Sequence, residues 1–435
     1  MPSRTGRLLP GFAAGLLAGI ALAQDDFETP RTLSASEVLP DELRRGDLHQ
    51  VDDAVRNDGY LNYYTIRSDY GDFEAAGTAL LRIRVAEIRA LAELDELSRT
   101  EVFIEAAADA GVGQLRTIKQ FAARPIDTIV GIPAGIGRFL TRTTRQAGDG
   151  LRAARDLLSD DDAGSDDGTA TERVGNAATS LAGSYFGVTT AERQWHRKLG
   201  TDPYTSNGVL REAVSSVAWA DRLGRFGIRQ AGIPRIPGVD VIDDVNDVVW
   251  SSDPYALRDL NRARLLDAGA DDELIAAFFE NPSLSPTLQT YLIAAIADLD
   301  GVAGRDGIVR QSLVTRSETE ARFFAESVVL LAWYHRNQAA IESLGAELAI
   351  PTGVKADGGT AMLLAADLVY WTEATAAAAS RHVSSRDAST VPHAHEIWLT
   401  GGVSDRARVE LTALGWDIHE NLTIMTVTDP QGSDE

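Results

Sequence analysis

The sequence predicts a mainly α fold, with a multi-helix body, a short N-terminal β element and a small C-terminal α/β unit of strand–helix–strand type. Three observations indicate this fold class. Apolar residues recur at three- and four-residue steps along most of the chain, which is typical of amphipathic helices. Residues 60–68 instead combine aromatic and β-branched residues after a turn signal, which favours a short strand. Near the C-terminus, short apolar runs flank one last helical pattern.

The first 23 residues have the layout of a secretory signal peptide. Two arginines precede an apolar run, and a small-x-small cleavage site ends at Ala23, just before Gln24. The run is shorter than the roughly 20 residues that a membrane-spanning helix needs, although an uncleaved anchor is the alternative. We therefore expect an exported protein, periplasmic or secreted. Residues 24–50 lack clear periodicity, which predicts a flexible leader.

The composition excludes several classes of function. The 435 residues include no cysteine, which excludes thiol chemistry, zinc–thiolate sites and iron–sulfur clusters. The net charge of −23 repels nucleic acid, so we expect no nucleic-acid partner. The motifs of serine hydrolases, phosphate-binding loops, metalloproteases and dinucleotide sites do not occur. The sequence therefore indicates no cofactor and no particular enzyme.

Residues 51–155 are predicted to form a helical N-terminal region. Within it, aliphatic residues recur at helical spacing over residues 72–110, so we expect one long amphipathic helix. Residues 156–175 mix carboxylates with glycine, serine and threonine, which favours an exposed acidic linker. Helical spacing returns over residues 176–380 and predicts an α-helical domain, whose clearest helix spans residues 317–336.

The segment "PIDTIVGIPAGIGRFLTRTTR" (residues 125–145) is the strongest functional candidate in the sequence. Apolar residues lie there at helical spacing, and three arginines recur every three or four residues. A basic amphipathic helix of this kind predicts contact with an anionic membrane surface or an envelope protein. Packing inside the protein is the alternative. The predicted contact residues are Ile129, Ile136, Arg138, Phe139, Leu140, Arg142 and Arg145.

Residues 393–429 predict the small α/β unit. "HEIWLTG" is typical of a strand, "SDRARVELTALG" of a helix, and "WDIHENLTIMTVTD" of one or two further strands. Such a unit is too small to bury its own faces, so it must dock on the helical body or on a partner. In this pattern it is similar to half of a ferredoxin-like module, such as those that bind peptidoglycan in bacterial envelopes.

Two short motifs suggest metal or phosphate chemistry. His393 and His395 would lie on the same face of a strand, so they form a candidate metal-binding pair. Exposed polar residues at the start of a strand are the alternative. Asp298-x-Asp300-Gly301 resembles the first motif of haloacid-dehalogenase-type phosphatases. The run before it has helical spacing, however, which favours the end of a helix.

Two hypotheses of function follow from the sequence. The first is a non-enzymatic, envelope-associated protein that contacts a membrane surface or a protein partner through residues 125–145. The second is a hydrolase or metal-binding enzyme whose aspartates and histidines come together only in three dimensions. The second hypothesis requires a cleft in which several titratable side chains converge.

Overall fold

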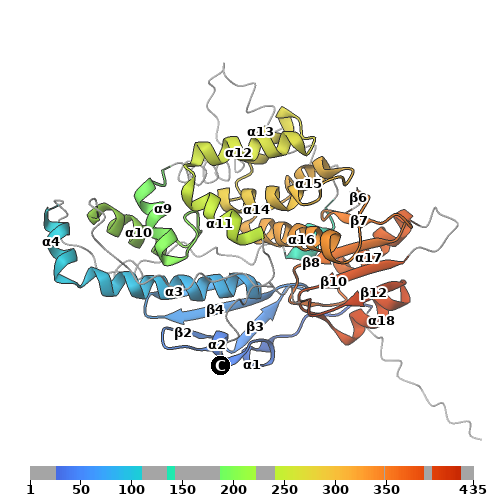
Figure 1. The fold of residues 1–435 in the computed structure, drawn as a ribbon. Coiled ribbons are helices and arrows are strands. Elements are labelled where there is room, and N and C mark those ends of the chain that lie inside the picture. Colours follow the sequence, from blue (N-terminus) through green and yellow to red (C-terminus); the bar gives the residue numbers. More distant parts are fainter. Residues whose placement is uncertain are drawn as a thin grey trace, which may run out of the picture.

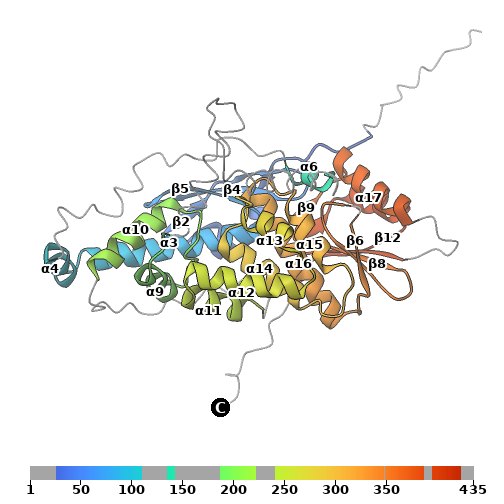
Figure 2. The same cartoon turned by 90° about the horizontal axis from the view of Figure 1, so that it is seen from above.

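The computed structural model describes residues 26–109, 135–142, 187–221, 241–346, 348–386 and 394–422. These residues form an N-terminal sheet covered by helix α3 (Thr78–Ser98), a body of helices, and a C-terminal sheet (Figure 1). Seen from above, α4 (Glu101–Asp109) lies at one end of the molecule and α17 (Glu373–Arg386) near the other (Figure 2).

The N-terminal sheet is antiparallel, with the order β1-β3-β4-β2 and with β5 also paired to β4. Its strands are β1 (Leu33–Ser34), β2 (His49–Val51), β3 (Ala54–Asn57), β4 (Asn62–Ser68) and β5 (Gly71–Ala76). Along β4, Tyr64 and Ile66 are buried while their neighbours are partly exposed, as expected for a sheet with one covered face. They share a core with Leu81 and Ile88 of α3. The predicted strand is therefore confirmed as β4. The single long helix predicted over residues 72–110 is confirmed only in part, because its first residues belong to β5 and the remainder is divided into α3 and α4.

The prediction of a flexible leader over residues 24–50 is wrong for its described part. Besides β1 and β2, this stretch forms α1 (Ala35–Val38) and α2 (Asp41–Arg44). Ser34 and Glu37 form a capping box at the start of α1. These elements are two to four residues long, and they depend on caps and strand pairing. They are too short to show a periodicity in the sequence.

The helical body follows. Its helices are α9 (Thr190–Leu199), α10 (Gly208–Ala220), α11 (Val241–Ser251), α12 (Pro254–Asp267), α13 (Asp272–Phe279), α14 (Pro286–Ala297), α15 (Arg305–Ser312) and α16 (Glu318–Asn337). Helix α16 begins after Ser317, whose hydroxyl accepts the N–H of Glu320. Its middle is buried on nearly all sides, because α14 packs on one side and the C-terminal sheet on another.

The C-terminal sheet has the order β12-β10-β8-β7-β6, in which β8, β10 and β12 run parallel and β6, β7 and β8 alternate in direction. Its strands are β6 (Ser343–Gly345), β7 (Thr352–Val354), β8 (Thr360–Leu364), β10 (His395–Leu399) and β12 (Trp416–His419). Helix α17 connects β8 to β10, and α18 (Asp405–Ala413) connects β10 to β12. A short parallel pair, β9 (Leu368–Val369) and β11 (Gly402–Val403), lies after β8 and β10.

The predicted strand–helix–strand unit is confirmed over β10, α18 and β12, but its boundary is wrong. Residues 343–380, assigned to the helical domain, supply the other strands of this sheet and most of α17, and the core of the sheet is continuous with that of the helical body. Strands β10 and β12 are direct neighbours. A ferredoxin-like unit splits its βαβ strands, so the resemblance to that module does not hold.

The predicted mainly α fold class is wrong. Two five-stranded sheets and a two-stranded pair accompany the helices of the described residues, so the fold combines α and β structure throughout. The hidden strands are mostly two to five residues long. In β8, "TAMLL" is buried at every position, and a short apolar run of this kind is indistinguishable from part of a buried helix in sequence.

Candidate functional site

The predicted contact segment lies inside the protein where the structure describes it. Ile136, Phe139 and Leu140 belong to the short helix α6 (Ile136–Leu140) and are at most 2% exposed. The Phe139 ring packs edge-on against Phe323 and Phe324 of α16. A Cβ on Gly137 would lie 2.9 Å from the Cβ of Ala374, so the glycine permits close packing on α17. These three apolar side chains are therefore core residues, which corrects their assignment to a membrane or partner surface.

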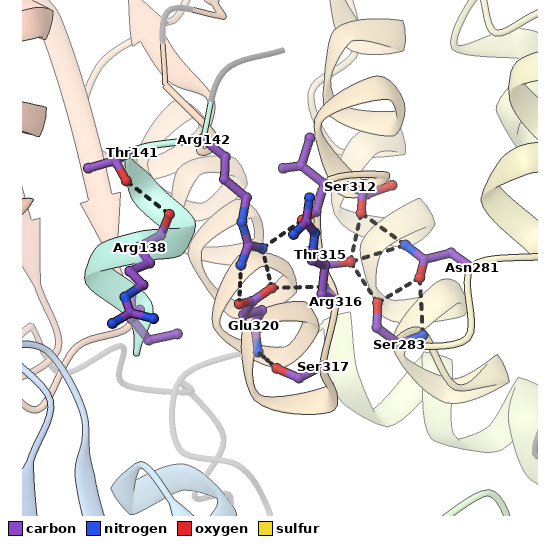
Figure 3. Close-up of polar contacts among 12 residues, drawn as sticks. Arg138, Thr141, Arg142, Asn281, Ser283, Ser312, Thr315, Arg316, Ser317 and Glu320 are labelled. Carbon is purple, nitrogen blue, oxygen red and sulfur yellow. Dashed lines mark hydrogen bonds and ion pairs between the residues drawn. The ribbon is translucent and has the colours of Figure 1, made fainter. Parts of the chain in front are cut away.

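Arg142 also has a partner inside the protein, the carboxylate of Glu320 at the start of α16. Its guanidinium forms two hydrogen bonds to this carboxylate, of 2.6 and 2.9 Å, and a third of 2.8 Å to the Val314 carbonyl. Figure 3 shows the Arg138 side chain extending away from this ion pair, and Arg138 is exposed. Ile129 and Arg145 lie outside the described residues. Of the three arginines of the hypothesis, the two that are described thus separate into one structural residue, Arg142, and one exposed residue, Arg138.

Of the predicted histidine pair, the structure describes His395 alone. His395 is 7% exposed, and its Nδ1 shares the Thr360 hydroxyl with Nε2 of His382, each at 2.9 Å. The two imidazoles lie against Trp416 on the buried face of the sheet. His393 lies outside the described residues, and among those that are described no three metal-ligating side chains converge. His395 is therefore placed as a core residue.

Asp298 and Asp300 follow the last turn of α14, as the helical interpretation of this motif predicts. The Asp298 carboxylate lies 3.2 Å from Arg336, and the Asp300 side chain is 89% exposed. The phosphatase chemistry of the resembling motif needs both aspartates at the end of a strand, so the arrangement does not support it.

A pocket of about 590 Å³ lies where the three parts of the fold meet. Its walls come from the start of α3, from α14 and α16, and from the loops after β8, β10 and β12. The carboxyl ends of parallel strands are the usual place for ligands in sheets of this type. Apolar and polar groups both line it. The apolar lining residues include Leu288, Phe323 and Leu422. The polar ones include Arg322, Glu326, Asp367, Thr400 and Asn421.

Glu326 is a titratable side chain of this pocket with an unusual ionisation. Its side chain is 25% exposed, and Oε1 faces Arg322 at 3.9 Å. Burial raises the pKa of Glu326 to about 7, with Arg322 opposing this shift and Asp367 adding to it. A carboxyl group that titrates near neutral pH can both give and take a proton.

Asp367, another carboxyl group of the pocket, has a structural task. Its two oxygens accept the backbone N–H groups of Asn62 at 2.9 Å and Thr78 at 3.1 Å. Thr78 opens α3, whose N-cap Gly77 has no side chain to cap the helix, so Asp367 supplies the missing acceptor. Burial raises the pKa of Asp367, although these hydrogen bonds counteract it. Glu37, the third carboxyl of the pocket, belongs to the capping box of α1 and pairs with Arg31, so Glu326 is the carboxyl left to a ligand.

Sequence reasoning did not find Glu326. The available signal was the four-residue spacing of Glu318, Arg322 and Glu326, which places alternating charges along one side of α16. Such spacing is common on solvated helices. Only the burial of this side of α16 distinguishes it, and that burial depends on other segments of the chain, from the start of α3 to the loop after β12.

Comparisons with known proteins give no further guide to the site, since no family model, curated protein or solved structure matches the chain. In the described residues, no helix is long and apolar enough to cross a membrane.

Proposed function

We propose that the protein binds a small molecule of mixed apolar and polar character in the pocket at the carboxyl ends of β8, β10 and β12, and that Glu326 exchanges a proton with it. The function is thus that of an acid–base enzyme acting on a small molecule. The proposal develops the hypothesis of a carboxyl site assembled only in three dimensions.

The single observation that carries this proposal is the convergence of the pocket walls on Glu326. Residues from all three parts of the fold form one concave site of about 590 Å³, which is large enough for a metabolite-sized ligand. Its apolar walls favour desolvation of the ligand, and Glu326 with Arg322 supplies the polar contacts that would orient it. The raised pKa of Glu326 supports a role in proton transfer.

The membrane-contact hypothesis has less support. Ile136, Phe139 and Leu140 are buried, and Arg142 is paired, so the described part of the segment offers Arg138 alone to a surface. Export is a separate proposal, which rests on the signal-peptide layout of residues 1–23. If it holds, the pocket operates in the periplasm or outside the cell.

The pocket is tested by screening a fragment library against residues 24–435 with ligand-observed NMR. Fragments that bind are then measured against the variant Ala79→Phe, because Ala79 lines the pocket and a phenyl ring there would occupy its volume. The matched control is Ala256→Phe on the exposed side of α12. We expect the fragments to bind the parent and the control and to lose binding to Ala79→Phe.

Two results would contradict the proposal. Fragments that bind Ala79→Phe as well as the parent would locate binding elsewhere. A screen in which no fragment binds the folded parent would remove the support for a small-molecule site. The thermal unfolding midpoint of Ala79→Phe is measured in parallel, and Leu330→Trp provides a second pocket-filling variant if the first does not fold.

A further inference from the structure

Three side chains on α16 form a ladder of alternating charge that leads into the pocket. Glu318, Arg322 and Glu326 are spaced by four residues, so they lie on successive turns of one helix side. The Arg322 guanidinium lies 3.3 Å from Glu318 through Nη2 and 3.9 Å from Glu326 through Nη1. The arginine side chain is only 14% exposed. One guanidinium therefore stands between two carboxyl groups, and only the Glu326 end of the ladder lines the pocket together with it.

The far end of the ladder is fixed by α3. Arg84 donates hydrogen bonds to Glu87 at 2.7 Å and to the Ser206 hydroxyl at 2.6 Å, and it attracts Glu318 electrostatically. Although burial works in the other direction, Arg322 and Arg84 hold the pKa of Glu318 below its usual value. Glu318 therefore stays negatively charged and binds Arg322 on the side away from the pocket.

The contacts on the pocket side are incomplete. Arg322 Nε and Glu326 Oε1 are buried and form no hydrogen bond within the described residues. A spacing of 3.9 Å between Nη1 and Oε1 is an electrostatic contact without a hydrogen bond. Arg322 is thus bound more closely to Glu318 than to Glu326, so its influence on Glu326 depends on how strongly Glu318 holds it.

We infer that Arg322 is the positioning residue of the pocket: held by Glu318, it sets which charge Glu326 presents to a bound molecule. This rests on the proposed function, because the charge of Glu326 matters to catalysis only if the pocket takes a ligand. Other charged groups act on the three side chains as well: Asp367, from the loop after β8, acts on Glu326, Asp202 acts on Arg322, and Arg84 acts on Glu318.

The inference predicts opposite effects from the two ends of the ladder. Removing the positive charge with Arg322→Gln should raise the midpoint of the Glu326 titration by about one pH unit, because a nearby cation favours the carboxylate. Glu318→Gln should lower the midpoint, since Arg322 is then free to approach Glu326. Arg322→Lys keeps the charge and should restore most of the parent's value.

The measurement is a ¹³C NMR titration of the glutamate side-chain carboxyls in residues 24–435, with the Glu326 signal assigned by its loss in Glu326→Gln. The titration uses no ligand, so the inference and the proposed function can fail separately. The midpoint can stay unchanged in the variants while fragments still bind, and it can shift as expected while no fragment binds. A Glu326 midpoint that is unchanged in both Arg322→Gln and Glu318→Gln would overturn the inference. Midpoints that move in the same direction in both variants would also overturn the inference, because a general loss of packing would shift the Glu326 midpoint the same way whichever charge is removed. Circular dichroism checks that each variant is folded, and Arg322→Lys still tests the inference if Arg322→Gln is not.

Discussion

Arg142 and Glu320 are 178 residues apart in the sequence and form a doubly hydrogen-bonded ion pair, with side chains only 12% and 4% exposed. The same carboxylate accepts the N–H of Arg316 at 2.7 Å, just before α16 (Figure 3). The pair therefore anchors the α6 segment to the start of the central helix. Arg142, which the sequence pattern assigned to contact with an anionic surface, is instead part of the interior.

The first prediction concerns this ion pair. Arg142→Ala should lower the free energy of unfolding by about 3–5 kcal/mol, because it leaves the Glu320 carboxylate buried without its cation. Arg138→Ala is the matched control, since its side chain is exposed, and should change stability by no more than about 0.5 kcal/mol. Urea denaturation of both variants measures the difference. Equal losses in the two would show that the pair does not anchor the segment.

The second prediction is a pH dependence caused by Glu326. Its pKa rises from the ordinary value of 4.5 to about 7 on folding, so the folded state binds more protons than the unfolded state between these values. Stability should therefore fall as pH rises through this window, by up to about 1.4 kcal/mol per pH unit from this group. Glu326→Gln should flatten the profile.

Asp202 contributes to the same profile, because burial raises its pKa from 3.8 to about 6. The comparison is therefore the difference between Glu326→Gln and the parent at each pH, taken from urea denaturation curves. A parent profile that the substitution leaves unchanged between about pH 5 and pH 7, which is most of the window, would contradict the shift.

The third prediction concerns the backbone at the pocket. A Cβ on Gly401 would overlap the carbonyl oxygen of Asp367, which cannot move without breaking the β9–β11 pairing. Gly401→Ala should therefore cost roughly 3 kcal/mol. Gly208→Ala, in the first turn of α10, meets nothing within 4 Å and should be neutral or stabilising by about 0.4–1 kcal/mol. The thermal unfolding midpoints of both variants test this prediction. A Gly401→Ala variant as stable as the parent would mean that the loops after β8 and β10 do not touch.

The fourth prediction concerns the attachment of the N-terminal segment to the C-terminal sheet. The Glu28 carboxylate accepts the Trp371 N–H at 2.6 Å and the Ser404 hydroxyl at 2.5 Å. Glu28→Ala should cost about 1.5–3 kcal/mol, the usual range for hydrogen bonds to a charged group. Amide exchange should become faster at Trp371 in this variant but not in the control Glu42→Ala, whose residue is exposed. Unchanged exchange at Trp371 would show that this contact does not form in solution.

The sequence was sufficient where an element is long and amphipathic. Leu81, Ile88 and Leu91 recur on one side of α3, and the predicted helix over residues 317–336 agrees with α16 within one residue at each end. The predicted strand–helix–strand pattern over β10, α18 and β12 was found for a similar reason, because β10 alternates between buried and partly exposed residues. In these elements the local pattern and the tertiary environment agree.

The sequence was insufficient where tertiary contacts decide. Strands such as β7 and β9 have two or three residues, so strand pairing alone defines them. The basic amphipathic pattern around Phe139 and Arg142 is the same whether its partner is a lipid surface or Glu320. Likewise, Glu326 gains its unusual ionisation from burial in the pocket and from Asp367, and the walls of this pocket come from segments far apart in the sequence.

The most direct test of the account is to titrate the Glu326 carboxyl by ¹³C NMR with and without a saturating fragment that binds the pocket. If Glu326 exchanges a proton with the bound molecule, saturation should move its titration midpoint by about half a pH unit or more, because the ligand replaces its water and changes its hydrogen bonds. The Glu326 midpoint should stay in place when the same fragment is added to Ala79→Phe. A midpoint that is identical in the free and the saturated parent would contradict the claim that this pocket and Glu326 form the functional site.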